Sequence, residues 1–400
     1  MSMGKAARPI GYGGLRVLIA GGGVAGLEAM LALRALAGEL VDIELLSVEH
    51  DFWYRPLAVA EPFDAGRAHR FDLGRIAEAA GACLTPGELS GVDTDAHVAR
   101  TAHGPELEYD VLLLACGALP RPMLPGALTF RGPADTERFT RLLRELEAGS
   151  VKTVVFALPS GASWSLPLYE LALLTSAHVQ ERGIAPVELS LVTHEPAPLA
   201  LFGQAASDGV AALLAERGIG LHTGCYPAAF EHGMLELVPK ATIAADRVVA
   251  LPRLEGARIA GIPQDGDGFV ATDEHGRVKG LANVYAAGDI TAFPVKQGGI
   301  AAQQADAVAE AIAAQAGADV KPRPFDPVLR GLLLTGGTPV YLRAELPGGR
   351  GDTSTIADEA LWWPPGKIVG RYLAPFLAEY GNLEIEPVAP DPPSSRARPS

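Results

Sequence analysis

Cysteine is scarce in this chain, which has only Cys83, Cys116 and Cys225 among its 400 residues. Their odd number and wide spacing exclude a disulfide framework. They also exclude a CxxC pair that could bind a metal or exchange disulfides, so we expect no metal site. A chain with so few cysteines is typical of a reducing, cytoplasmic setting.

Long apolar runs and an excess of basic residues are also missing. No uninterrupted apolar run approaches the ~18 residues of a membrane span, and residues 1–14 lack the apolar segment of a secretory signal. Asp and Glu outnumber Lys and Arg by 47 to 33, and the net charge of −14 argues against a nucleic-acid surface, which needs clustered cations. These absences predict a protein that is neither secreted by that route nor integral to a membrane.

A glycine-rich turn near the N-terminus is the strongest signal that is present. The apolar run at 17–20 predicts a buried strand, Gly21, Gly23 and Gly26 form a GxGxxG pattern, and an Ala- and Leu-rich helical pattern follows. The first glycine allows a tight turn, the second lets backbone N–H groups approach a pyrophosphate, and the third lets the helix pack on the strand. The sequence therefore predicts a dinucleotide site, with contacts from Gly21, Gly23, Val24, Ala25 and Gly26.

A carboxylate follows at the distance that this motif requires. Residues 41–48 predict a second strand, and Glu49 ends it about 20 residues beyond the last glycine, where a carboxylate accepts ribose hydroxyls. Glu44 and Asp51 lie nearby and the register of the strand is open. A solvated charge at the strand end is therefore the other interpretation of Glu49.

The rest of the chain alternates strand-like and helix-like segments, which predicts the α/β class with two Rossmann-like, three-layer domains and a C-terminal cap. Pro120, Pro122 and Pro125 interrupt the chain and mark a domain junction. The predicted parts are a first dinucleotide domain at 14–122 and 246–325, a second at 123–245, a C-terminal cap or interface region at 326–386, and a disordered tail at 387–400.

Later motifs resemble a known superfamily. An apolar strand ends in Ala115-Cys116-Gly117, where Ala-Thr-Gly is usual, and residues 284–289 (VYAAGD) precede a long Ala-rich helix. In this order the motifs resemble the FAD-dependent pyridine nucleotide-disulfide oxidoreductase-like superfamily. Residues 161–170 (GASWSLPLYE) and 289–306 are most similar to sulfide:quinone oxidoreductases and type II NADH dehydrogenases.

The chain departs from those relatives in its cysteines. The redox cysteine of the sulfide enzymes' motif corresponds to Trp164, so a cysteine persulfide route is not expected. The lack of a close cysteine pair excludes the disulfide reductases. Cys116 lies in a buried strand, where apolar packing is favoured over reactivity because burial raises the pKa of a thiol.

The resemblance implies FAD as the cofactor. It places the glycine turn at the pyrophosphate, Glu49 at the adenosine ribose and Asp289 at the ribitol or pyrophosphate. A carboxylate at a strand end beside a helix N-terminus can accept hydroxyl hydrogen bonds while it complements the helix dipole. The further cofactor contacts are predicted to be Arg55, Cys116, Gly117, Gly288 and Gly299.

The isoalloxazine is expected between the loop that holds Arg55 and Pro56 and the loop at 293–299. In the second loop, Lys296 is predicted to stabilise negative charge at the N1–C2=O edge of the reduced flavin. A solvated loop lysine is the other interpretation of Lys296. The predicted catalytic residues are Lys296, Arg55 and Pro56.

The second α/β unit is where the relatives bind NAD(P)H. Here only Gly161 remains of the fingerprint, while Pro159 removes an N–H donor and Leu158 adds a side chain. Glu195 follows the next strand as a ribose-binding carboxylate would, although a surface charge fits equally. The unit is either an NAD(P)H site or a domain kept for its shape.

These features predict a soluble FAD-dependent oxidoreductase that passes two electrons from NAD(P)H to a quinone-like acceptor, with small molecules as its partners. Two alternatives are a sulfide:quinone oxidoreductase-like enzyme without the usual redox cysteines, and a non-catalytic flavin-binding sensor or interaction protein. The aromatic and basic stretch at 361–380 suits either packing over the flavin or weak peripheral contact with the inner face of a membrane. The resemblance is also compatible with a homodimer.

Overall fold

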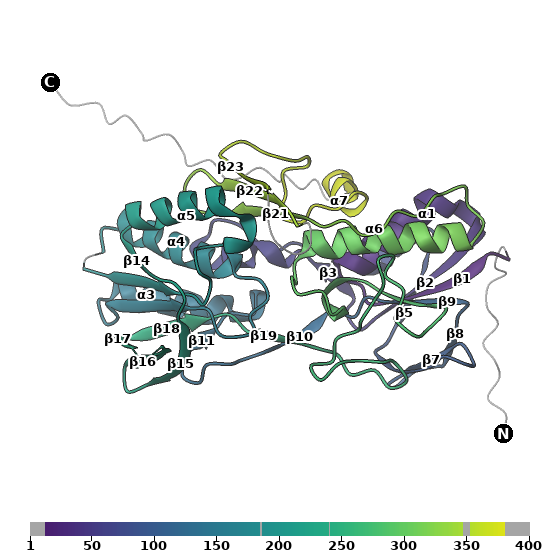
Figure 1. Ribbon diagram of the computed structural model, residues 1–400, viewed down its shortest axis with the longest axis horizontal. Helices are drawn as coiled ribbons and strands as arrows, with labels where there is room; N and C mark the ends of the chain where they lie inside the picture. The colour runs from purple at the N-terminus through teal and green to yellow at the C-terminus, as the bar shows by residue number, and fades with distance from the viewer. Residues whose placement is uncertain (1–12, 185, 240, 347–352, 381–400) are drawn as a thin grey trace.

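The computed structural model describes residues 13–184, 186–239, 241–346 and 353–380. Figure 1 shows two α/β units side by side, with a small third sheet over the junction between them. None of the helices in these ranges is long and apolar enough to cross a membrane. The tail predicted at 387–400 lies outside the described residues.

The first unit is built on a five-stranded parallel sheet. Its elements are β1 (Leu15–Ala20), α1 (Val24–Ala37), β2 (Val41–Ser47), α2 (Leu73–Ala79), β5 (Cys83–Pro86), β6 (Leu89–Asp93), β7 (Val98–Thr101), β8 (Leu107–Glu108), β9 (Val111–Leu114), β20 (Val284–Ala286) and α6 (Gly298–Gln315). The strand order is β20-β9-β1-β2-β5. Val17 and Ile19 face the helices, whereas Leu18 and Ala20 face the antiparallel meander β6-β7-β8, because successive side chains of a strand point to opposite faces.

The second unit repeats this plan. Its elements are β11 (Leu128–Thr129), α3 (Thr136–Glu147), β12 (Thr153–Ala157), α4 (Leu166–Glu181), β13 (Glu188–Val192), α5 (Gln204–Glu216), β14 (Ile219–His222), β15 (Tyr226–Glu231), β16 (Met234–Val238), β17 (Ala241–Ala244) and β18 (Arg247–Ala250). Five parallel strands have the order β11-β18-β12-β13-β14, with helices on one face and the meander β15-β16-β17 on the other. The predicted α/β class with two Rossmann-like units is confirmed.

The sequence predicts that the chain returns to the first unit at residue 246. β18 begins one residue later, and it pairs in parallel with β12, with Val249 opposite Phe156. Val248 and Val249 are both buried in the cores of the second unit, one on each face of the sheet. We therefore propose that the boundary lies after β18.

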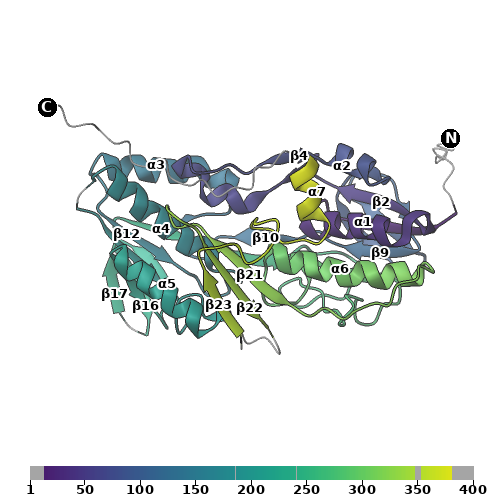
Figure 2. The same cartoon turned by 90° about the horizontal axis from the view of Figure 1, so that it is seen from above.

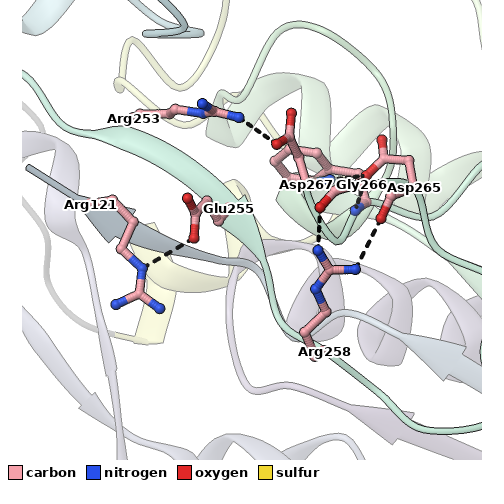
Figure 3. A network of polar contacts seen from close by, with 8 residues as sticks. Arg121, Arg253, Glu255, Arg258, Asp265, Gly266 and Asp267 are labelled. Atoms are coloured by element: carbon pink, nitrogen blue, oxygen red, sulfur yellow. Dashed lines mark hydrogen bonds and ion pairs between the residues drawn. The ribbon is translucent and has the colours of Figure 1, made fainter. Parts of the chain in front are cut away.

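Two antiparallel strands connect the units. They are β10 (Ala118–Arg121) and β19 (Arg253–Gly256). Arg121 Nε lies 3.2 Å from Glu255 Oε2 across this ribbon, and Arg253 is ion-paired with Asp267 (Figure 3). Arg258 donates hydrogen bonds to the backbone carbonyls of Asp265 and Gly266, which lie in the same loop as Asp267. These contacts hold the ribbon against the first unit where the chain re-enters it.

A third, antiparallel sheet and a short helix complete the described chain. They are β21 (Val328–Leu333), β22 (Val340–Glu345), β23 (Thr353–Ala357) and α7 (Leu373–Tyr380). Figure 2 shows this sheet over the junction of the two units and α7 beside α1. Glu28 of α1 accepts hydrogen bonds from the backbone N–H groups of Tyr372 and Leu373, which anchors the start of α7 on the first unit.

The aromatic segment after β2 forms a small substructure of its own. It consists of β3 (Asp51–Trp53), the 3-10 helix η2 (Arg55–Val59) and β4 (Arg70–Asp72), which pairs with β3. Tyr54 OH accepts a hydrogen bond from the backbone N–H of Ile368 at 3.0 Å. This bond joins the predicted flavin loop to the C-terminal segment.

Candidate active site

The turn between β1 and α1 requires glycine at two positions. Gly21 has a φ of +125°, and a Cβ on it would overlap the carbonyl oxygen of Ala115. A Cβ on Gly26 would overlap the carbonyl oxygen of Gly21. The helix can therefore lie this close to the strand only because both residues are glycine.

Gly23 has a different environment, because no atom lies within 4 Å of the position that its Cβ would take. It is the N-cap of α1, no side chain caps the helix, and the first turn carries no acidic residue. The first N–H groups of a helix have no partner within it, so this open end suits a pyrophosphate. Glu49 is exposed just beyond the end of β2, at the same edge of the sheet.

The Gly-Asp motif lies against this helix N-terminus. Gly288 begins the 3-10 helix η6 (Gly288–Ile290), and a Cβ on it would come 3.0 Å from the Cβ of Ala25. Gly288 N donates a hydrogen bond to Gln304 Oε1 at 2.8 Å, which ties the motif to α6 as well. Asp289 therefore lies where the N-terminal ends of α1 and α6 converge.

Cys116 lies beside the same turn. Its Sγ is 3.2 Å from the carbonyl oxygen of Ala20, and burial raises the pKa of the thiol to about 12. A thiol with this pKa carries almost no thiolate at neutral pH. Cys116 lies just beyond β9 and not within the strand, and it is half-buried against the core between the sheet and the meander. Gly117 follows it with a φ of +71°.

A pocket of about 290 Å³ lies between the two units. It brings together four of the residues predicted around the flavin: Arg55, Pro56, Asp289 and Lys296. The predicted contact Gly299 is not among the lining residues, although its neighbour Gly298 is. Much of the wall is apolar, with contributions from Phe130, Trp164, Leu166, Leu251 and Leu332.

Lys296 is buried in this pocket, with 7% of its surface exposed. Its Nζ donates a hydrogen bond to the Thr291 carbonyl and lies 3.9 Å from the centroid of the Phe269 ring. Burial lowers the pKa of Lys296 to about 8, while Asp289 opposes the shift. The interpretation of Lys296 as a solvated loop lysine is therefore wrong. Burial also raises the pKa of Asp289, against the attraction of Lys296 and Arg55.

A buried ion pair in the same pocket was not foreseen. Lys367 Nζ lies 2.5 Å from Glu170 Oε1, and the side chains are 6% and 1% exposed. Burial raises the pKa of Glu170 and lowers that of Lys367, and each charge counteracts the shift of the other. Glu170 ends the 161–170 motif and Lys367 lies in the aromatic stretch, but no local pattern joins them.

Ser163 and Trp164 complete the wall on the side of the second unit. Ser163 Oγ is buried and has no hydrogen-bond partner among the described residues. The Trp164 ring lies 5.9 Å from that of Phe202. An aromatic side chain thus lines the pocket at the position where the sulfide enzymes' motif has cysteine.

Comparison with known proteins identifies the family. Residues 15–316 match the family model described as pyridine nucleotide-disulphide oxidoreductase. The chain belongs to this family. The resemblance predicted from the motifs is thereby confirmed, and the family supports an oxidoreductase role.

The chain is also similar to individual proteins and to a solved structure. An NADH dehydrogenase-like protein of Mycobacterium tuberculosis is 28% identical over 299 residues, which cover 69% of this chain and 73% of that protein. A sulfide-quinone reductase of Aquifex aeolicus is 28% identical over 198 residues, covering 45% of this chain and 43% of that protein. The X-ray structure of the sulfide:quinone oxidoreductase from Aquifex aeolicus has a TM-score of 0.76 at 21% identity, covering 93% and 91% of the two chains.

In the second unit, the predicted ribose-binding carboxylate Glu195 is buried. Glu195 is 9% exposed, so its interpretation as a surface charge is wrong. Its Oε1 accepts a hydrogen bond from Ser165 Oγ at 3.0 Å, and its Oε2 accepts bonds from Tyr169 OH at 2.7 Å and Thr193 Oγ1 at 2.9 Å. Binding of a ribose by Glu195 remains a prediction.

Proposed function

We propose that this chain is a FAD-dependent oxidoreductase that takes two electrons and two protons from a reduced small molecule and passes them to a quinone-like acceptor. The observation that carries the proposal is the pocket, in which the buried side chains of Lys296 and Lys367 stand in largely apolar walls. Apolar walls suit a planar ring, and a small number of polar groups can orient its oxygens.

FAD suits the first unit. Its pyrophosphate would lie at the open end of α1 beside Gly23, its adenosine ribose at Glu49, and its ribitol or pyrophosphate at Asp289. When bound, FAD supplies the two-electron chemistry. The positive charges of Lys296 and Arg55 at the pocket would stabilise the negative charge that reduction places on the ring system.

Protons for the acceptor can come from the buried ion pair. Lys367 Nζ can donate a proton to an acceptor oxygen, and the neutral amine can then take a proton from water that enters the pocket, while the Glu170 carboxylate stabilises the ammonium form. Burial lowers the pKa of Lys367 toward neutral pH, as a proton donor requires. The free hydroxyl of Ser163 is available to a second oxygen of the acceptor.

NAD(P)H, the donor predicted from the sequence, is left out of the proposal because the second unit lacks a glycine cradle. A second candidate function is the oxidation of sulfide or a small thiol with a quinone-like acceptor. The 28% identity to a sulfide-quinone reductase and the 161–170 motif favour it. With Trp164 in place of the cysteine, this reaction would not pass through a cysteine persulfide.

The test is anaerobic stopped-flow absorbance at the oxidised-flavin band of protein loaded with FAD. We expect duroquinone to restore the band rapidly after the flavin has been reduced by light. The variant Lys367→Met should slow this step by about 100-fold, the low end of general acid catalysis, whereas exposed Lys279→Met should not. No reoxidation of the wild type would indicate a flavin-binding sensor, and failure to retain FAD would contradict the whole proposal.

The donor is tested in a second mixing experiment with oxidised protein. Bleaching of the flavin band by NADH or NADPH would show that a nicotinamide dinucleotide is the electron donor. Bleaching by sulfide or dithiothreitol, with none by NADH or NADPH, would support the second candidate function.

A further inference from the structure

We propose that Glu195 is a positioning residue, which holds the pocket wall of the second unit in place, and that this unit therefore binds no nicotinamide dinucleotide. The inference rests on the proposed function in that the wall faces the acceptor.

The strand-to-helix turns of the two units differ. In the first unit, the three residues Gly21 to Gly23 separate β1 from α1, and the N-cap has no side chain. In the second unit, residues 158–165 separate β12 from α4. Leu158 is buried there, and Pro159 has no N–H to offer. This longer loop cannot present backbone N–H groups as the glycine turn does.

The remaining glycine of the second turn is covered. The position that a Cβ would take on Gly161 lies 3.3 Å from Arg253 Cδ. The guanidinium of Arg253 is held by Asp267, as Figure 3 shows. The arginine therefore covers the turn with its aliphatic stem, while its charge is directed to a carboxylate of the first unit.

The two carboxylates at equivalent positions also differ. Each follows the second strand of its sheet, Glu49 after β2 and Glu195 after β13. Glu49 is exposed, whereas Glu195 is buried and accepts three hydrogen bonds from hydroxyls of its own chain. A carboxylate that already accepts these three hydrogen bonds cannot also accept hydrogen bonds from the two hydroxyls of a ribose.

The N-terminal end of α4, where a pyrophosphate would bind, is also occupied. Ser165 is the N-cap of α4 and Tyr169 lies in its first turn, so the Glu195 carboxylate sits at the N-terminal end of this helix. A negative charge there complements the helix dipole. A pyrophosphate brought to the same end would meet a buried like charge where the dielectric constant is low.

The same hydrogen bonds support the pocket wall. Ser165 stands between Trp164 and Leu166, which line the pocket, and Tyr169 directly precedes Glu170 of the buried ion pair. Holding the two hydroxyls fixes the first turn of α4, and with it the direction of Trp164 and Glu170. Glu195 thus acts on the pocket through its neighbours and does not line the pocket.

The test uses FAD-loaded full-length protein and two readouts. Equilibrium dialysis with NADH and NADPH should show no saturable binding up to ~1 mM, the upper range of ordinary KM values. With light-reduced enzyme, Glu195→Ala should raise the duroquinone concentration that gives half the maximal rate of flavin reoxidation, here called the KM, by about tenfold, the equivalent of one hydrogen bond, with the maximal reoxidation rate changed less. The conservative variant Glu195→Gln should stay within about threefold of the wild type, because it keeps an acceptor oxygen.

The matched control is Glu216→Ala, at the exposed end of α5, which should leave the KM unchanged. Saturable NADH or NADPH binding that Glu195→Ala abolishes would overturn the proposal and make Glu195 a ribose ligand. An unchanged KM in a folded Glu195→Ala variant would overturn the positioning role. If Glu195→Ala does not fold, Tyr169→Phe removes one of the same hydrogen bonds and should raise the KM in its place.

Failure of the proposed function gives a different result. In that case duroquinone does not reoxidise the wild-type flavin at all. The dialysis result still decides whether the second unit binds a dinucleotide.

Discussion

Lys367 Nζ and Glu170 Oε1 are 2.5 Å apart, although 197 positions separate the two residues in the chain. The pair joins the C-terminal segment to α4 inside the pocket. Glu170 Oε1 also accepts a hydrogen bond from the backbone N–H of Leu334 at 2.9 Å, so three parts of the fold meet at one carboxylate.

Removal of one partner of this pair should destabilise the protein strongly. Lys367→Met leaves a buried, unpaired carboxylate and should lower the free energy of unfolding by about 3–5 kcal/mol. The double variant Lys367→Met/Glu170→Leu should recover most of this loss, because no buried charge remains. Urea unfolding measures both. A double variant as unstable as the single one would show that the pair contributes through its shape and not its charge.

Lys296 should make the FAD-free protein less stable below pH 8. Its pKa falls from 10.5 to about 8 on folding, so the unfolded chain binds a proton in this window that the folded chain has lost. Stability therefore rises with pH between the two values, by about 3 kcal/mol for a shift of this size. Lys296→Met should be more stable than the wild type near pH 7, and the difference should close near pH 10.5. Exposed Lys279→Met should show no such trend in the same urea titrations.

Asp306 of α6, which lies near Glu28 of α1, should have the opposite effect on the pH dependence of stability. Burial and the nearby charge of Glu28 raise the pKa of Asp306 from 3.8 to about 8. The folded state then holds a proton that the unfolded state has lost, so this stability is fully present below pH 3.8 and disappears as pH rises through 8. Asp306→Asn should raise the free energy of unfolding near pH 8 by about 1–3 kcal/mol, with little gain near pH 4. Asp319→Asn, at an exposed site, is the control, and an equal gain at both pH values would contradict the assignment.

The glycines of the first turn should separate folding from cofactor binding. Gly23→Ala adds a methyl group where no protein atom lies within 4 Å, so stability should change by no more than ~0.5 kcal/mol. The affinity for FAD should nevertheless fall, because the methyl group projects into the open helix end. Gly26→Ala should destabilise the protein, because its Cβ would overlap the Gly21 carbonyl. Flavin fluorescence titration and urea unfolding give the two quantities. Equal FAD affinity in Gly23→Ala and wild type would argue against a pyrophosphate at this turn.

Much of the fold was predictable because its signals are local. The strand, glycine turn and helix at 17–26 occupy one continuous stretch, and so does the Gly288-Asp289 motif with the helix that follows it. Each motif carries its own backbone requirement, such as the positive φ of Gly21 and Gly288. The sheet to which a strand belongs is not local information, so the pairing of β18 with β12 comes only from the tertiary structure.

The sequence by itself determined the α/β class, the glycine turn of the first unit, and the residues Arg55, Pro56, Asp289 and Lys296 that meet in the pocket. Only the tertiary structure decided that Lys296 and Glu195 are buried, and that Glu170 finds Lys367. The physical reason is that burial and long-range pairing depend on which elements pack together. A charged residue at a strand or helix end has the same sequence pattern whether it faces water or a partner from a distant part of the chain.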